Sequence, residues 1–350
     1  MKHQTTRYGE IPFYKIGTFG NTADAFISKK LFLEYKTKYS FPKKGDILIS
    51  ASGTIGRAVI YDGKPAYFQD SNIVWIDNDE TLVKNDFLFY AYSHVKWNTE
   101  HTTILRLYND NFRNTLIPLP PLNEQIAIAN ILSDVDHYLY SLDALILKKE
   151  SVKKALSFEL LSQRKRLKGF NQNWQRVRLG DICEIVKGQQ INKISLTNTD
   201  KYPVINGGID FLGYTNKFNV SKNTIAISEG GTCGYVRFMT SNFWSGGHNY
   251  SLQKISNKVN NLCLYHILKS YEKDIMKLGV GSGLKNIQLK ALKDFEIPLP
   301  PLNEQSAIAD ILSGLDNEIA SLKNKKRQFD NIKKALNHDL MSAKIRVLKK

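Results

Sequence analysis

Side chains able to read the edges of DNA bases are concentrated in stretches rich in Gly, Asn and Asp, where loops are expected. Arg and Lys pair with guanine, Asn and Gln pair with adenine, and Ser or Thr serve either base. In the first third of the chain the candidates are Lys15, Lys43, Lys44, Ser52, Thr54, Arg57, Asn72, Arg106, Asn109, Asn111 and Arg113. Further along they are Lys187, Gln189, Gln190, Asn192, Lys193, Lys217, Thr232, Arg237, His248, Asn249, Lys285 and Asn286. Taken singly, each is more often a solvated loop residue than a base contact, so the hypothesis rests on the group.

The sequence carries no motif for catalysis. It has no GxxxxGK[ST] phosphate loop, and Gly279–Gly283 (GVGSG) lacks the strand and helix of a dinucleotide fingerprint, which predicts a loop there. The Pro-Pro pairs stand in LPPL, not in the Asn/Asp-Pro-Pro-aromatic motif of an adenine methyltransferase. The seven histidines form no metal-spaced cluster. We therefore expect no catalytic residue, no metal site and no cofactor bound by this chain.

The charge balance favours a polyanionic partner. Lys and Arg number 49 against 33 Asp and Glu, which gives a formal net charge of +16. Nucleic acid is the first expectation and an anionic membrane surface the second, and a basic protein without a specific anionic partner stays the bland alternative. No secretory signal and no apolar run of about 18 residues is present, and the three cysteines are widely spaced. These features predict a cytoplasmic protein with reduced thiols.

The positioning elements follow from an internal repeat. Ile117–Asp136 and Ile297–Asp316 are identical at 16 of 20 positions, with an offset of 180 residues, and the likeness continues through Ser141–Leu156 and Ser321–Leu336. Pro120 and Pro121 end an extended segment, and Asn123 is placed to cap a helix whose first turn carries Glu124. The chain therefore has two equivalent halves, each with one long helix.

Apolar residues in each predicted helix alternate at intervals of three and four, which is typical of a coiled-coil seam. The first seam contains Leu132, Val135, Leu139, Leu142 and Ile146, is interrupted at Lys149, and resumes at Val152, Leu156 and Leu160. The second contains Leu312, Leu315, Ile319 and Leu322, and resumes at Phe329, Ile332, Leu336 and Leu340. Packing the two helices together is the simplest way to bury both seams. At about 1.5 Å per residue each helix would span roughly 60 Å and keep two domains apart; two core helices of one compact domain are the alternative.

The segments outside the helices share an outline. Ile225–Gly234 (IAISEGGTCG) matches Ile47–Gly56 (ILISASGTIG), Tyr202–Gly208 resembles Ile11–Gly17, and a helix expected at Asp86–Asn98 matches Asn261–Lys273. Short β-rich runs broken by Gly, Asn and Asp indicate hairpins. The fold class is therefore α+β: two mainly β domains with small helices, separated by two long helices that form an antiparallel coiled coil with pseudo-two-fold symmetry. The expected boundaries are 1–116, 117–168, 169–296 and 297–350.

The duplicated IPLPPLNEQ helix, together with Trp174–Gly188 (WQRVRLGDICEIVKG) and YPVINGG, resembles the specificity subunit of type I restriction-modification systems over nearly the whole chain. The resemblance implies two target recognition domains that each read half of a bipartite double-stranded DNA sequence, and helices that set the gap. It also implies a non-catalytic subunit that binds two modification (methyltransferase) subunits and two restriction subunits. S-adenosylmethionine, ATP and magnesium are then expected on those partners, and the methylated adenine is flipped into the methyltransferase.

The resemblance implies further that the repeats dock the methyltransferase subunits. The residues expected to do so, or to form the coiled coil, are Leu122, Glu124, Gln125, Leu132, Leu139, Leu142, Leu302, Glu304, Gln305, Leu312, Ile319 and Leu322. One departure stands out: Trp174 precedes Pro203 by 29 residues, whereas 11 residues precede the matching Pro12. We expect the first recognition domain to be weakened as a result.

Two alternatives stay open from the sequence. One is a coiled-coil interaction protein that assembles partners without reading DNA. The other is a truncated or silent recombining copy of the specificity subunit. A DNA-binding titration against salt separates the first from the leading hypothesis, because only a DNA reader combines a steep salt dependence with a sequence preference.

Overall fold

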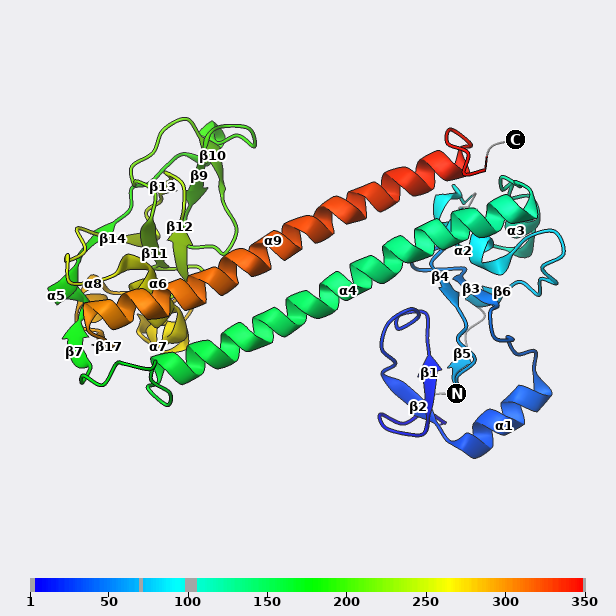
Figure 1. Ribbon diagram of the computed structural model, residues 1–350, viewed down its shortest axis with the longest axis horizontal. Helices are drawn as coiled ribbons and strands as arrows, with labels where there is room; N and C mark the ends of the chain where they lie inside the picture. The colour runs from blue at the N-terminus through cyan, green and yellow to red at the C-terminus, as the bar shows by residue number, and fades with distance from the viewer. Residues whose placement is uncertain (1–3, 69–71, 98–105, 349–350) are drawn as a thin grey trace. The chain divides into compact units, whose positions relative to one another are not determined.

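The computed structural model describes residues 4–68, 72–97 and 106–348 (Figure 1), and it contains two compact units. The first unit is Met1–Asp143 with Asn324–Lys350, and the second is Ala144–Lys323. Each unit combines one globular segment with half of each long helix. The predicted boundaries give each helix to a domain of its own, whereas each helix contributes packing surface to both units.

Two small sheets form the β-framework of the first unit. One has the order β2-β1-β5 with β1 and β5 parallel, and the other has the order β4-β3-β6 with antiparallel neighbours. The elements are β1 Ile11–Tyr14, β2 Ala25–Ile27, α1 Lys29–Lys38, β3 Ile47–Ser50, β4 Ala58–Ile60, β5 Tyr67–Phe68, β6 Ile73–Trp75, α2 Asn85–His94 and α3 Asn109–Arg113. The predicted helix at Asp86–Asn98 corresponds to α2, and Asn98 lies outside the described residues.

Strand β3 explains why its sequence is apolar without alternation. Ile47 and Ile49 pack with Leu88 and Tyr92 of α2 on one face, whereas Leu48 packs with Phe19 and Tyr61 on the other. A strand buried on both faces needs apolar residues at every position. Strand β11 of the second unit repeats this, because Ile225 and Ile227 face one apolar cluster and Ala226 another.

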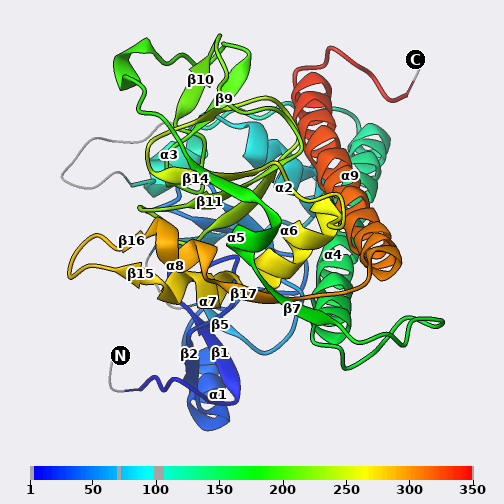
Figure 2. The same cartoon turned by 90° about the vertical axis from the view of Figure 1, so that its left-hand side faces the viewer.

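The second unit is viewed face-on in Figure 2. Its sheets have the orders β10-β9-β13 and β12-β11-β14-β8, with pairs β17-β7 and β15-β16 beside them. The strands are β7 Gln175–Arg178, β8 Glu184–Lys187, β9 Tyr202–Ile205, β10 Gly213–Thr215, β11 Thr224–Ser228, β12 Val236–Met239, β13 Trp244–Ser245, β14 Asn249–Gln253, β15 Gly279–Val280, β16 Asn286–Ile287 and β17 Glu296–Leu299. The helices are α5 Leu179–Ile182, η1 Lys193–Ser195, α6 Asn261–Ser270, α7 Glu272–Lys277 and α8 Leu289–Lys293. The stretch Gly279–Gly283, expected as a loop, begins with a strand of the β15-β16 hairpin.

Both units share one strand framework, as the matched motifs predict. The order β2-β1-β5 corresponds to β10-β9-β13, including the parallel outer pair. The order β4-β3-β6 corresponds to β12-β11-β14. The second unit adds β8 at the edge of β14 and β7 beside β17.

The long helices α4 (Leu122–Leu161) and α9 (Leu302–Met341) pair in each unit. In the first unit Asp136 pairs with Lys333 and Asp143 with Lys326, so numbers rise along α4 as they fall along α9. In the second unit Lys153 pairs with Asp316, the 180-residue equivalent of the pair between Lys333 and Asp136. The helices are therefore antiparallel, as predicted.

The seam prediction is confirmed in part. Leu132, Leu139, Leu142, Ile146 and Leu160 of α4, and Leu312, Ile319 and Leu340 of α9, are buried, and Leu322 is half-buried. The prediction is wrong for Val152, Leu156 and Ile332, whose exposed fractions are 40%, 36% and 50%. Charged pairs take the interface at this level, as between Lys149 and Glu318 at 2.8 Å. Helix α4 also begins at Leu122, so Asn123 lies inside its first turn, where its Oδ1 accepts from the Glu124 amide.

Candidate nucleic-acid interface

Five loops of the second unit are joined into one cluster by hydrogen bonds. The β11–β12 turn is tied to its neighbours because Glu229 N donates to the His248 carbonyl at 2.9 Å and Thr232 N donates to the Gly207 carbonyl at 2.8 Å. The Ile287 amide donates to the Glu229 carbonyl, which adds the β15–β16 hairpin. Trp244 Nε1 donates to the Gln189 carbonyl, which adds the loop after β8. The loops therefore present a preorganised surface.

Glu229 lies at the centre of this cluster. Its side chain accepts from Lys187 Nζ at 2.7 Å and from the Tyr250 hydroxyl at 3.3 Å. Burial raises the pKa of Tyr250 to about 12, and the Glu229 charge adds to the rise, so the phenol stays a donor. Lys187 thus both neutralises a nearly buried carboxylate and keeps about half of its side chain exposed.

The exposed polar side chains on the cluster have the chemistry that base edges require. Gln189 and Gln190 extend from the loop after β8, His248 from the loop before β14, and Lys285 and Asn286 from the β15–β16 hairpin. Amides pair with adenine, and a lysine ammonium pairs with guanine or a phosphate. The structure therefore brings these sequence-predicted residues to one surface.

Glycine is required where the loops approach one another. A Cβ on Gly207 would lie 2.6 Å from the Gly230 carbonyl oxygen, and Gly207 has a φ of 81°. A side chain at this position would be strained and would push the loop after β9 away from the β11–β12 turn. The close approach supports the packing role of the YPVINGG glycine.

The first unit brings together a smaller set of candidates. Ser52 and Arg106 face each other as a β-bridge, and the Ala51 amide donates to the Asn72 carbonyl at 2.7 Å. Thr54 is exposed at the tip of the β3–β4 turn. The loop after β1, which carries Lys15, reaches the same turn because Ile16 lies against Gly53. Lys15 is paired there with Asp24.

Several candidates are corrected by their burial or their partners. Asn111 is 8% exposed and its Oδ1 accepts from the Tyr108 amide, which caps α3. Asn249 is 1% exposed inside β14, and Ser52 is 9% exposed, so neither side chain can reach a base freely. Pattern alone missed this, because an amide suits a buried cap as well as a base edge.

Two arginines point into the protein. Arg57 Nη1 donates to the Phe19 carbonyl at 2.9 Å. Arg237 Nη2 donates to the carbonyls of Gly208 and Ile209, both at 2.6 Å, and its guanidinium lies 5.0 Å from the Tyr235 ring centroid. Arg237 therefore holds the loop after β9 in place instead of offering its donors to DNA.

The remaining candidates lie apart from the two loop groups. Lys43 and Lys44 precede β3, at the end opposite to the β3–β4 turn, and Lys43 pairs with Asp77 at 3.0 Å. Arg113 pairs with Asp110 on α3, beside Asn109. Asn192 caps η1, which contains Lys193, and Lys217 follows β10. These residues are exposed and suit phosphate contacts better than the shared reading surface.

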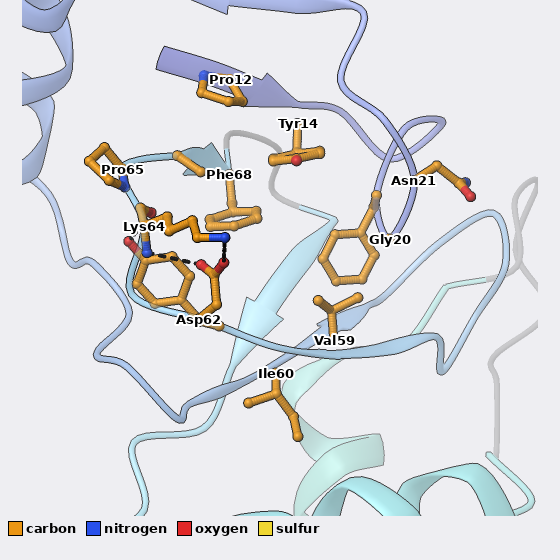
Figure 3. A pocket seen from close by; sticks show the side chains of 13 residues that line it. Pro12, Tyr14, Gly20, Asn21, Val59, Ile60, Asp62, Lys64, Pro65 and Phe68 are labelled. Atoms are coloured by element: carbon orange, nitrogen blue, oxygen red, sulfur yellow. Dashed lines mark hydrogen bonds and ion pairs between the residues drawn. The ribbon is translucent and has the colours of Figure 1, made fainter. Parts of the chain in front are cut away.

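An aromatic hollow lies between the sheets of the first unit (Figure 3). Its volume is about 430 Å³, and Tyr14, Phe68, Val59 and Asn21 are among the residues lining it. Tyr14 and Phe68 stack at 5.3 Å. Asp62 and Lys64 form an ion pair at its edge. The hollow bears no relation to the exposed candidates, and we assign it no role.

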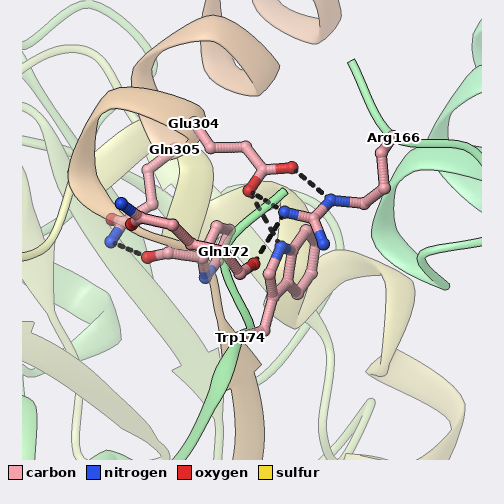
Figure 4. A network of polar contacts seen from close by, with 6 residues as sticks. Arg166, Gln172, Trp174, Glu304 and Gln305 are labelled. Atoms are coloured by element: carbon pink, nitrogen blue, oxygen red, sulfur yellow. Dashed lines mark hydrogen bonds and ion pairs between the residues drawn. The ribbon is translucent and has the colours of Figure 1, made fainter. Parts of the chain in front are cut away.

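The repeated NEQ residues are internal anchors, as the second unit shows (Figure 4). Glu304 is 1% exposed and accepts from Arg166 Nε at 2.8 Å, from Arg166 Nη2 at 2.7 Å and from Trp174 Nε1 at 3.0 Å. Gln305 accepts from the Asn260 amide and donates to the carbonyls of Lys258 and Pro300. The start of α9 is therefore tied to the chain that leads into α6.

The first unit repeats these anchors. Glu124 accepts from Arg346, whose hydrogen bonds hold the pKa of Glu124 below its usual value, and Gln125 accepts from the Lys84 amide at 2.8 Å. The expectation that Glu124, Gln125, Glu304 and Gln305 dock a partner is corrected, because all four are buried by contacts within their own units. Leu122 and Leu302, 39% and 45% exposed, remain accessible.

Sequence reasoning missed the partners of these anchors. Arg166 and Arg346 stand 180 residues apart, so the repeat offset itself was a signal for them. Trp174 gave no such signal, because its role depends on a carboxylate 130 residues away.

No metal-binding group of three or more His, Cys, Asp or Glu occurs within the described part of the chain; His3 and His101 lie outside it. No helix in that part is long and apolar enough to cross a membrane.

A family model of the type I restriction modification DNA specificity domain matches residues 1–149 and again residues 171–329. The chain belongs to this family. The two matches fall on the two halves of the duplication, so each half is one copy of the type I specificity domain.

Relatives of the same family align over different lengths. A putative type I restriction enzyme specificity subunit of Haemophilus influenzae is 65% identical over 133 residues, which cover 38% of this chain and 34% of that protein. A putative type I restriction enzyme specificity subunit of Methanocaldococcus jannaschii is 30% identical over 335 residues, covering 87% of this chain and 79% of the relative. The chain thus spans about a third of the first relative and most of the second.

A solved structure has the same fold. The crystal structure of the type I restriction-modification S subunit from M. genitalium matches with a TM-score of 0.72 and 21% identity, covering 97% of this chain and 91% of that one. The α+β fold with paired long helices is therefore that of a specificity subunit.

Proposed function

We propose that this chain is the non-catalytic subunit that reads a bipartite DNA sequence for a type I restriction-modification complex. The observation that carries the proposal is one strand framework, present twice, with different polar side chains on its loops. A shared framework with unequal loops suits two readers of unequal half-sites. The net charge of +16 supports a polyanionic partner.

The proposal includes the partners of the chain. Two modification subunits would bind exposed faces of α4 and α9, such as those around Leu122 and Leu302, and restriction subunits would join them. S-adenosylmethionine, ATP and magnesium would belong to those subunits. Bound to its DNA, such a complex would work in the cytoplasm, and the continuous helices would set the gap between half-sites.

The test is to sequence the methylated sites of DNA modified by this chain with its modification subunit. We expect one bipartite motif. Asn286→Ala should relax recognition at one position of one half-site, by roughly ten- to a hundredfold for a lost bidentate contact. Asn257→Ala, an exposed amide outside the loop cluster, is the matched control and should leave the motif unchanged.

A coiled-coil scaffold that does not read DNA predicts a different result. Binding to DNA would then show no sequence preference at any salt concentration, and neither asparagine variant would change the modified sites. That outcome would reject the proposed function.

A further inference from the structure

In the second unit, one continuous segment, Trp174–Lys187, occupies three neighbouring places. Strand β7 pairs with β17, with Val177 opposite Ile297. Leu179 and Ile182 of α5 pack into the main apolar core. Strand β8 then pairs with the edge of β14, with Ile185 opposite Leu252. The duplication makes it possible to ask what occupies the equivalent places in the first unit.

The first place is the extended stretch 116–119, equivalent to β17 at the 180-residue offset. Among the described residues it has no strand partner, and Leu116 is 92% exposed. Leu119, equivalent to Leu299, is 50% exposed. An unpaired apolar stretch of this kind is a ready template for strand addition.

The second place is a hollow of about 230 Å³, lined by Pro118–Pro121, Glu124, Ile128, Leu340 and Arg346. Its volume exceeds the ~150 Å³ that accommodates a benzene ring. Glu124 and Arg346 are the equivalents of Glu304 and Arg166, against which Trp174 packs in the second unit. The hollow therefore lies where the duplication places an indole ring.

The third place is another apolar hollow, of about 240 Å³, whose lining includes Ile76, Val83, Leu88 and Ile117. Their equivalents Leu252, Val259, Leu264 and Ile297 form one cluster with Leu179 and Ile182. Beside this hollow, β6 ends its sheet as described, whereas its equivalent β14 carries β8. The gap therefore continues from a strand to a turn and to a second strand.

We propose that the first unit contains a docking groove for a single segment with the chemistry of Trp174–Lys187, supplied by a separate polypeptide. The segment would place a Trp beside Glu124 and Arg346, add a strand to 116–119, fill the second hollow with the apolar pair of a Leu-Gly-Asp-Ile turn, and extend the sheet at β6. This inference concerns the completion of a domain and does not rest on DNA reading.

A second copy of this chain is the weaker candidate for the occupant. Each copy carries one such segment and already buries it, because Leu179 is 0% and Ile182 8% exposed in the second unit. Lending it to a neighbour would fill one groove and empty an equivalent one. Exchange between copies therefore brings no net gain in buried surface.

The experiment uses the full chain and a labelled synthetic peptide of residues 173–188, with Cys183 replaced by Ser. We expect saturable one-to-one binding by fluorescence anisotropy. A peptide with Trp174→Ala should bind roughly tenfold more weakly or worse, because a buried aromatic anchor dominates such contacts. Amide exchange should slow at 116–119 and 73–76, with no change at 296–299.

A matched pair of chain variants tests the location. Leu119→Glu, in the lining of the first hollow, should abolish peptide binding, whereas Leu82→Glu, at a 65% exposed position that lines neither hollow, should bind as the parent does. The proposal is overturned if no binding saturates below about 1 mM, if the Trp174→Ala peptide binds equally well, or if protection appears at 296–299. Dimers of the chain alone that share the 174–187 segment would overturn the choice of occupant.

Discussion

At the scale of single residues, the repeated polar side chains hold the fold together. Gln125 and Gln305 each make three hydrogen bonds from a buried amide and tie a helix start to the chain before α2 or α6. A buried amide that satisfies three backbone groups leaves them unpaired when it is removed. The identity of the repeats at these positions therefore reflects the same internal contacts made twice.

Gln125→Ala tests this role. The Lys84 amide and the carbonyls of Leu82 and Pro120 would lose their partner, which we expect to lower the free energy of unfolding by about 1–3 kcal/mol. Urea unfolding followed by circular dichroism measures the change. Gln328→Ala, an exposed glutamine in the same unit, should change it by less than about 0.5 kcal/mol. Equal effects of the two variants would contradict the anchoring role.

His266 predicts a pH dependence. Its Nε2 lies 3.0 Å from Ser313 Oγ, and burial lowers its pKa to about 4, although Asp316 opposes the shift and Lys153 adds to it. The unfolded state, with a histidine pKa of about 6.5, binds the proton more readily between these two values. Stability is therefore complete above pH 6.5 and falls as the pH drops toward 4, by about 2 kcal/mol at pH 5.

The first unit offers the replacement, because Tyr90 stands at the equivalent position and donates to Asp136 at 2.9 Å. We expect His266→Tyr to reduce the loss of unfolding free energy between pH 7.5 and 5. The exposed His248, replaced by Gln, serves as the control and should keep the parent slope. An unchanged slope in His266→Tyr would rule out His266 as its source.

At the scale of elements, ion pairs replace apolar contacts where the helix seam is interrupted. Lys149 and Glu318 face each other across α4 and α9 in the second unit, and the equivalent positions in the first unit hold Phe329 and Tyr138, whose rings lie 4.6 Å apart. The two units thus solve the same packing position by charge in one case and by aromatic contact in the other.

Charge reversal tests this pairing. Glu318→Lys sets two like charges together, and we expect it to lower the free energy of unfolding by roughly 0.5–1 kcal/mol, a modest amount because both side chains are partly exposed. Adding Lys149→Glu should restore most of the loss, and a double-mutant cycle gives the coupling. If the double variant is as unstable as the sum of the two single variants, the pair does not interact.

At the scale of the whole molecule, the duplication makes the helix halves interchangeable. Lys333 meets Asp136 in the first unit as Lys153 meets Asp316 in the second. A fragment of residues 169–350 keeps α9 and the second recognition segment but not α4. The second half of its α9 has the contacts needed to replace α4 on another copy.

We therefore expect this fragment, together with the modification subunit, to form a two-fold dimer. Such a dimer should modify an interrupted palindrome that contains the second half-site twice. Sedimentation analysis gives the assembly state, and sequencing of modified sites gives the target. A fragment that stays monomeric in the presence of the modification subunit would show that the halves are not equivalent.

The sequence alone determined the duplication, the two long helices, the β-framework and the family. These depend on local periodicity and on repeated motifs, which survive without knowledge of any contact. Residues such as Ile225 and Ile47 could be matched because their neighbours in sequence are also their neighbours in the strand.

Only the tertiary structure decided which side chains are exposed. Asn249 and Asn286 are both loop-like amides in sequence, yet one is buried in β14 and the other lies on the reading surface. Val152 and Ile332 keep the helical period but face solvent, because lysines pair with carboxylates across the helices at that level. Burial is set by partners up to 222 residues away, as between Glu124 and Arg346, and no local pattern contains them.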